Sequence, residues 1–102
     1  MTPGDVVEIL SGDHVGHLGV VLDLHPNGLV GVACGTGTAG RDDTHYVIRA
    51  RERFGLRMGL PKDTYFYQSR GIAWAKPDQF KSTERTAPPD VVRELRKLHG
   101  LV

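Results

Sequence analysis

Residues 4–24 read GDVVEILSGDHVGHLGVVLDL, two apolar runs separated by a polar connection that contains glycine. In the first run, residues 5–10, Val7 and Ile9 fall on one face, and Val6, Glu8 and Leu10 on the other, which is typical of a half-buried strand. The second run, residues 18–24, is more continuously apolar and predicts a more buried strand. The stretch therefore predicts a strand, a flexible loop and a second strand.

The chain continues with further strand-like segments. The turn signal Pro26-Asn27-Gly28 predicts a hairpin that leads into a returning strand. The expected strands after this turn are residues 29–34, residues 45–50, and a fifth strand or strand pair from residue 64 to near residue 74. Between them, residues 51–59 form a charged connection that is expected to be mobile or helical.

The C-terminal segment has the pattern of an amphipathic helix. Pro88-Pro89-Asp90 suits a first helical turn, and Gly100 suits a helix end. Val92, Leu95 and Leu98 recur at helical spacing, so this stripe is expected to pack on the strands, with partner binding as the alternative. Residues 1–102 are thus predicted to form one mostly β domain, a small, partly open barrel with a C-terminal helix at about residues 88–99.

The composition indicates the cellular compartment in which the protein is expected. Cys34 is the single cysteine, so an intramolecular disulfide is impossible and a reducing compartment is expected. The sequence shows no signal-peptide pattern and no apolar run of membrane-spanning length. We therefore expect a cytoplasmic protein without a membrane partner.

Charge is distributed unevenly along the chain. Residues 1–40 carry four acids and no lysine or arginine, whereas residues 41–102 carry 13 bases and 8 acids, a balance of 13 − 8 = +5. The second half is therefore a candidate surface for a polyanion, with scattered solvated charge as the alternative.

Several enzyme and cofactor classes lack their sequence patterns. His14 and His17 offer two imidazoles, but no third metal ligand stands at a recognisable spacing, so no metal is predicted. The Gly35-Thr36-Gly37-Thr38 run lacks the Gly-Lys-Ser/Thr ending of a nucleotide-binding loop, and no Gly-x-Ser-x-Gly elbow is present. No cofactor is expected.

The remaining polar residues suit binding or cleavage of RNA. A metal-independent ribonuclease needs a group that takes the 2′-hydroxyl proton and donors that stabilise the phosphorane. We expect His17 to exchange the proton, Thr36 and Arg41 to complete the catalytic set, and His14, Thr38, Arg49 and Arg70 to belong to the wider RNA-binding set. Each also has a structural interpretation, as a turn residue or as ordinary surface charge.

Aromatic residues cluster after residue 64. Tyr65, Phe66, Tyr67 and Trp74 alternate along a predicted strand pair, so some must face the core. The others can stack on bases or pack against a second subunit, and core or dimer packing is the more common use.

Short motifs along nearly the whole chain resemble those of the MazF/PemK (Kid/CcdB-like) toxins of type II toxin–antitoxin modules. Gly4-Asp5-Val6-Val7 matches the opening Gly-Asp-x-Val strand of that family, and residues 17–22 (His-Leu-Gly-Val-Val-Leu) are similar to its His-Arg-Pro-x-Val-Val-Leu strand. Residues 32–36 (Val-Ala-Cys-Gly-Thr) are similar to a strand ending in Cys-Thr-Thr, and residues 68–74 look like its Gln-x-x-x-Ile-Ala-Trp stretch.

This resemblance implies a Src-homology-type barrel that dimerises, cleaves single-stranded RNA without metal, and is neutralised by a cognate antitoxin protein. It places the family's catalytic threonine at Thr36 and its glutamine at Gln68, which the resemblance adds to the expected RNA-binding set. The position of the catalytic arginine is Leu18, and Tyr67 replaces the acid that usually precedes the glutamine. Another residue, such as His17 or an arginine from elsewhere, must then supply the missing function, or catalysis is lost.

A second resemblance covers only the first 30 or so residues. Gly4, Asp5, Val7, Ile9, Ser11 and Gly12, followed by Gly16, Gly19 and Val21, look like a KOW motif, the strand-loop-strand that ribosomal and transcription-elongation proteins use to contact RNA. KOW loops usually carry Lys or Arg among the glycines, whereas this loop has neither Lys nor Arg.

The resemblance along the whole chain makes a toxin-like endoribonuclease the leading hypothesis, with RNA across the loops of residues 11–17 and 34–41. The alternative is a non-catalytic KOW-like or toxin-like barrel that binds RNA or a protein.

Overall fold

A three-stranded antiparallel meander begins the chain. In the computed structural model, which describes residues 1–40 and 43–101, β1 (Asp5–Ile9) pairs with β2 (Leu18–Leu24), and β2 pairs with β3 (Val30–Cys34). In the β2–β3 turn, Asn27 Oδ1 accepts a hydrogen bond from the amide of Leu29 at 3.0 Å. Such a local side-chain bond is the reason that asparagine favours turns.

Two further strands extend the meander to a five-stranded antiparallel sheet. β6 (Ile72–Ala75) pairs with β3 and β7 (Phe80–Thr86) pairs with β1, which gives the order β6-β3-β2-β1-β7. The two edge strands are joined in sequence by the short 3-10 helix η2 (Pro77–Gln79) and do not pair with each other, so the sheet is open. The fold is mostly β, as predicted.

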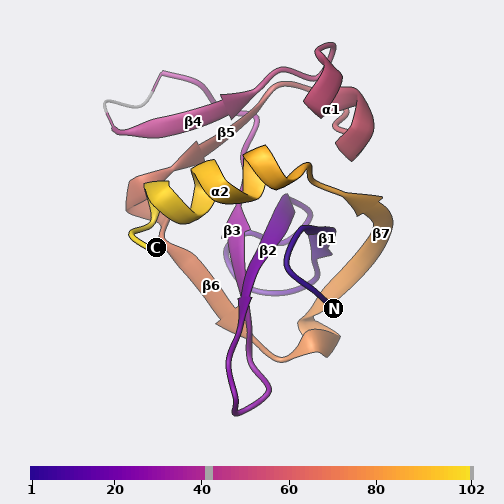
Figure 1. Cartoon of the computed structure of the whole chain (residues 1–102), viewed down its shortest axis with the longest axis vertical. Coiled ribbons are helices and arrows are strands. Elements are labelled where there is room, and N and C mark those ends of the chain that lie inside the picture. Colours follow the sequence, from indigo (N-terminus) through magenta and orange to yellow (C-terminus); the bar gives the residue numbers. More distant parts are fainter. Residues whose placement is uncertain (41–42, 102) are drawn as a thin grey trace.

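A separate two-stranded sheet lies against this one (Figure 1). It consists of β4 (His45–Ile48) and β5 (Thr64–Tyr67), which are connected through helix α1 (Arg53–Met58). The 3-10 helix η1 (Gln68–Arg70) then leads from β5 into β6. An isolated bridge between Thr36 and Tyr65 links the end of β3 to this second sheet.

The large sheet is apolar on both faces. Val7, Ile9 and Phe80 belong to one buried cluster with residues of β2, β3 and β6, whereas Val6 belongs to a second cluster with residues of β4, β5 and α2. The prediction that residues 5–10 form a half-buried strand is confirmed in part: Glu8 is only partly buried and Leu10 is exposed. Val6, on the same face, is fully buried because the second sheet and the C-terminal helix cover it.

Helix α2 (Pro89–Leu98) lies across the face of the meander (Figure 1). It ends in a Schellman motif, in which the amide of Gly100 binds the carbonyl of Lys97 and the amide of Leu101 binds that of Arg96. Gly100 has a φ of 73°, a value that glycine adopts without steric cost. No helix in the described part of the chain is both long and apolar enough to cross a membrane.

Strand β7 was missed by the sequence prediction, which gave five strands or six. Its sequence, FKSTERT, is polar, and only Phe80 at its start is fully buried. An edge strand with a solvated face carries little hydrophobic periodicity, so its sequence resembles that of a loop.

Candidate nucleic-acid interface

Two loops that are distant in sequence meet at one end of the meander. The β1–β2 loop and the loop after β3 together line a pocket of about 200 Å³. Its walls are residues 16–18, residues 35–38 and part of the segment that leads into β5, namely Pro61, Lys62 and Thr64. We call this space the cationic pocket, for the reasons below.

Backbone hydrogen bonds hold His17 at the pocket. The amide of Ile9 binds the carbonyl of His17 at 3.0 Å, and the amide of Gly16 binds the carbonyl of Ile9 at 2.8 Å. These bonds continue the β1–β2 ladder beyond the two strands. His17 is therefore positioned by strand pairing rather than by a free loop.

The threonines of the second loop are also held by the backbone. Thr36 exchanges hydrogen bonds with Tyr65, from the Thr36 amide at 2.9 Å and from the Tyr65 amide at 2.7 Å. The Oγ1 of Thr36 accepts a bond from the amide of Thr38 at 3.2 Å, as in a Ser/Thr turn. Thr36 is buried, so its hydroxyl is a fixed group in the wall of the pocket.

Lys62 is a member of the pocket that sequence reasoning missed. A Cβ on Gly37 would lie 2.3 Å from Lys62 Cε and 2.6 Å from Nζ, so the lysine side chain crosses the backbone at this glycine. The absence of a side chain at Gly37 thus allows the ammonium group to lie beside the loop. A solitary lysine after Pro61 carries no sequence signal for this placement.

Arg70 and His14 form a second basic group next to His17. The Nη1 of Arg70 donates to His14 Nδ1 at 2.6 Å, an arrangement that requires this nitrogen to be unprotonated. The imidazole rings of His14 and His17 lie 6.1 Å apart. Among the described residues, the buried atoms His17 Nδ1 and Arg70 Nε have no hydrogen-bond partner.

The surroundings of His17 favour its neutral form. Burial lowers the pKa of its imidazole, and the charges of Arg70 and Lys62, together with the neighbouring His14, lower it further. A neutral imidazole can accept a proton, and the nearby cations attract an anion. The pocket therefore combines a proton acceptor with charges that favour a phosphate group.

An aromatic surface adjoins the pocket on the outer face of β4 and β5. We use this name for His45 and Tyr65, whose rings lie 6.1 Å apart. The buried ring of Tyr67 lies next to both, 5.5 Å from His45 and 6.2 Å from Tyr65. The hydroxyl of Tyr67 donates to the carbonyl of Thr38 at 2.8 Å, which ties the loop of the cationic pocket to this surface. Arg49 lies at its end and donates to the Tyr65 hydroxyl at 3.3 Å.

The four aromatic residues singled out in the sequence thus have different environments. Phe66 packs in the core, and Tyr67 is buried beneath the loop after β3. Tyr65 is half-buried and Trp74 is 41 % exposed. Tyr65 and Trp74 are therefore the two with faces that can meet a ligand.

The structure brings together part of the site predicted from sequence. His17, Thr36 and Thr38 line the cationic pocket, and His14 and Arg70 lie next to it. Arg49 lies at the aromatic surface, where Asp63 Oδ2 accepts a bond from its Nη1 at 3.1 Å.

Two predicted residues are not part of this arrangement. Gln68 is absent from the lining of the cationic pocket and instead lines two other pockets of about 300 Å³ each, one with His45 and one with Trp74. Arg41, the third residue of the predicted catalytic set, lies outside the described residues.

Metal-ligating side chains do not converge in the described parts of the chain, residues 1–40 and 43–101, where no group of three His, Cys, Asp or Glu could hold an ion. Burial raises the pKa of the Cys34 thiol to about 11, so the thiol is protonated and a poor nucleophile at neutral pH. The chemistry available at the pocket is therefore that of imidazole, hydroxyl, ammonium and guanidinium groups.

Comparison with known families matches residues 3–32 to the KOW motif, which is 30 of the 102 residues. The matched segment contains β1, the loop with His14 and His17, β2 and the start of β3. Comparison with curated proteins and with solved structures gives no match. The KOW resemblance noted in the sequence is thereby confirmed, and it associates this small β-rich fold with RNA binding.

Proposed function

We propose that this protein binds single-stranded RNA, with a phosphate in the cationic pocket and a base against the aromatic surface. Phosphates are attracted by Lys and Arg, and unpaired bases stack on aromatic rings. The loop that holds Thr36 and Thr38 lies between the two surfaces, and its contacts with Tyr65 and Tyr67 join them. A flexible single strand can reach both surfaces, whereas a base in a duplex is not available for stacking.

The placement of Lys62 and Arg70 carries this proposal. The KOW-like loop has no lysine or arginine of its own, which argued against a phosphate site when the sequence was considered alone. In the folded chain these two cations, from the basic second half of the sequence, lie beside His17 and Thr36. The fold thus supplies the charge that the loop lacks.

Binding can be tested by fluorescence anisotropy with a labelled single-stranded RNA and a duplex of the same sequence. The Lys62→Ala and Arg70→Ala variants are expected to weaken single-strand binding about tenfold each, with Lys81→Ala on β7 as the matched control. The duplex is expected to bind more weakly. Equal affinity of the three variants and the unchanged protein would exclude the pocket as the RNA site.

A second candidate function is metal-independent cleavage of that RNA, as in a MazF/PemK-like toxin. The observation that favours it is that His17 lies in one pocket with Thr36 and Lys62, in surroundings that lower the pKa of its imidazole. In this reaction the 2′-oxygen gives its proton to His17 and attacks the phosphorus. The bond to the 5′-oxygen breaks, and the products are a 2′,3′-cyclic phosphate and a 5′-hydroxyl, which takes up a proton. Lys62 and Arg70 would balance the charge of the phosphorane in place of the family arginine.

Cleavage is tested by incubating a long single-stranded RNA with the protein in the presence of a chelator. The cleavage hypothesis expects discrete fragments with cyclic phosphate ends, and a loss of about 100-fold or more in rate for His17→Ala. If the RNA binds tightly but stays intact, the cleavage hypothesis is excluded and the protein binds RNA without cleaving it. This second candidate function also includes the dimer and the neutralising antitoxin that the toxin resemblance implies.

A further inference from the structure

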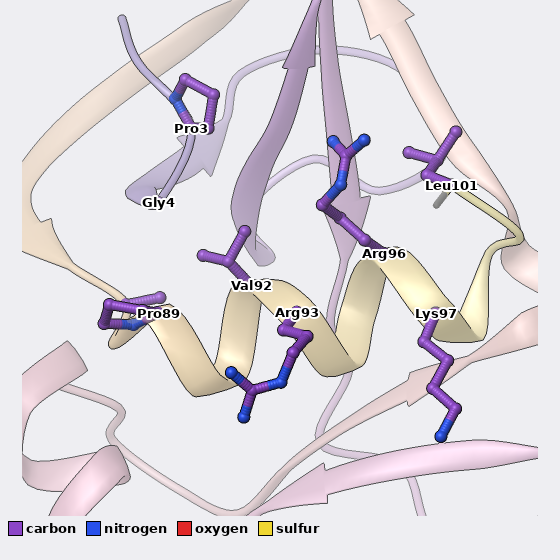
Figure 2. A pocket seen from close by; sticks show the side chains of 9 residues that line it. Pro3, Gly4, Pro89, Val92, Arg93, Arg96, Lys97 and Leu101 are labelled. Carbon is purple, nitrogen blue, oxygen red and sulfur yellow. The ribbon is translucent and has the colours of Figure 1, made fainter.

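A groove larger than the cationic pocket lies along helix α2. It has a volume of about 620 Å³ and shares no lining residue with the cationic pocket. Figure 2 shows its position between the helix and the N-terminal segment. Its apolar lining is formed by Pro3, Gly4, Ala87, Pro89, Val92 and Leu101. We call it the helix groove.

The floor of the helix groove is held by close packing. A Cβ on Gly4 would lie 3.7 Å from Val92 Cγ2, so the N-terminal segment and the helix are in near contact there. Directly behind Val92, the side chains of Val91 and Leu95 are fully buried in the core. The groove is therefore part of the folded framework.

Every charged residue that lines the groove is basic. Arg93 and Lys97 extend from one side of α2, and Arg96 rises from the other side toward strand β2 (Figure 2). Arg96 is fixed by a bond from Nη1 to the carbonyl of Leu22 at 2.7 Å, and Arg93 pairs with Asp90 at 2.8 Å. Lys97 makes no hydrogen bond or ion pair with the described residues, so its charge is available to a ligand.

From this arrangement we infer that the helix groove binds an acidic, aliphatic peptide segment of a partner protein. Aliphatic side chains of the peptide cover the apolar floor, and carboxylates on its flanks meet the cations on the two edges. Arg96 and Lys97 line the groove, as does Arg93, which shares its charge with the exposed Asp90. Cations spread in this way along the helix match several carboxylates better than one anionic head group. This interaction goes beyond the RNA function and does not depend on it.

The proposal is tested with a fluorescein-labelled peptide composed of leucine and glutamate, and with a control peptide in which lysine replaces glutamate. The unchanged protein is expected to bind the first peptide and not the second. Lys97→Glu is expected to weaken binding about tenfold. Pro3→Glu, at an exposed position on the opposite wall, is expected to weaken it to a similar degree without disturbing a buried contact.

Two charge-matched variants separate this site from general electrostatic attraction. Lys81→Glu lies on β7 outside the groove, and Lys62→Glu lies in the cationic pocket. Both are expected to leave peptide affinity within about twofold of that of the unchanged protein. The proposal is overturned if all four variants weaken binding equally, if Lys62→Glu alone does so, or if neither peptide binds. It is also overturned if dilution shows self-association that Lys97→Glu disrupts, because a second copy then occupies the groove.

Discussion

The cationic pocket and the helix groove are both basic, yet their walls differ in chemistry. The pocket is walled by backbone, threonine hydroxyls and an imidazole, with the buried Nδ1 of His17 unpaired among the described residues. The groove presents aliphatic side chains, and its cations stand at the edges. Basic charge alone therefore does not define a ligand. A polar wall suits a phosphate that forms hydrogen bonds, whereas an apolar floor suits a ligand that also buries hydrocarbon.

Both sites rest on one apolar core, which contains Val20, Leu22 and Phe66 together with Leu95 of α2. Leu95→Ala leaves a cavity in this cluster and is expected to lower the free energy of unfolding by about 2–5 kcal/mol. At temperatures where this variant is still folded, its affinities for RNA and for the peptide should either both fall or both stay unchanged. Urea denaturation measures the free energy of unfolding. The control is Leu24→Ala at an exposed position, which should lower this free energy by at most about 0.5 kcal/mol. Loss of one affinity alone would show that the two sites are supported separately.

The two sites should also differ in how strongly salt weakens binding of their ligands. If Lys62 and Arg70 each neutralise one phosphate, the slope of log affinity against log salt is about −1.4 for single-stranded RNA. A fourfold rise in salt then weakens RNA binding about sevenfold. The leucine and glutamate peptide should lose less, because burial of its aliphatic side chains is not screened. Anisotropy titrations at several salt concentrations compare the slopes, and equal slopes would mean that the apolar floor contributes nothing.

The pH dependence of RNA binding gives a further contrast. The pKa of His17 is lowered in the free protein, mainly by burial, and a bound phosphate stabilises the charged imidazolium and raises it. RNA affinity should therefore increase, by about threefold to fivefold, as pH falls from about 7.5 to about 5.5. His17→Asn should remove most of this increase, whereas the Lys97→Glu variant should retain it. A pH-independent affinity in the unchanged protein would show that His17 does not face the phosphate.

Protonation of His17 should strengthen RNA binding but weaken the stability of the free protein. Burial lowers the pKa of both His17 and His99 in the folded state, so the unfolded chain binds more protons below its own pKa of about 6.5. Without RNA, stability should therefore be lost as pH falls through that range. Urea midpoints at about pH 7.5 and about pH 5.5 measure the loss, which His99→Asn should reduce.

The smallest expected effect concerns Gly37. A Cβ at this position meets the flexible end of Lys62, so Gly37→Ala should displace the ammonium group and weaken RNA binding about threefold. Stability should change by no more than about 0.5 kcal/mol, because a lysine end can move without cost to the core. Peptide binding at the helix groove should not change. A larger loss of stability would show that the lysine is held more firmly than this geometry suggests.

The strands that bury side chains were predictable from the sequence. Alternating or continuous apolar residues mark β1 to β5, and the proline start and glycine end mark α2. Hydrophobic periodicity could not reveal β7, because its residues are mostly solvated. It also could not reveal the full burial of Val6, which depends on where α2 and the second sheet pack.

The site was predictable only in part. Glycine-containing loops at His17 and Thr36 indicated flexible segments that could approach a ligand, and the fold brings them together. The bond between His14 and Arg70 spans 56 positions, and no local pattern encodes a contact of that range. The same holds for Lys62, whose position at Gly37 follows from how β5 enters the second sheet.

The irregular pairing of β7 with β1 has a consequence for the protein in concentrated solution. Glu84 has a left-handed φ of 63°, and the register of the two strands shifts between Val6 and Val7. Thr83 Oγ1 binds the carbonyl of Val6 at 2.7 Å within this bulge. A bent, charged edge of this kind is a poor template for a strand from another molecule. Along β7, neighbouring copies are therefore kept from the edge-to-edge growth that begins fibrils.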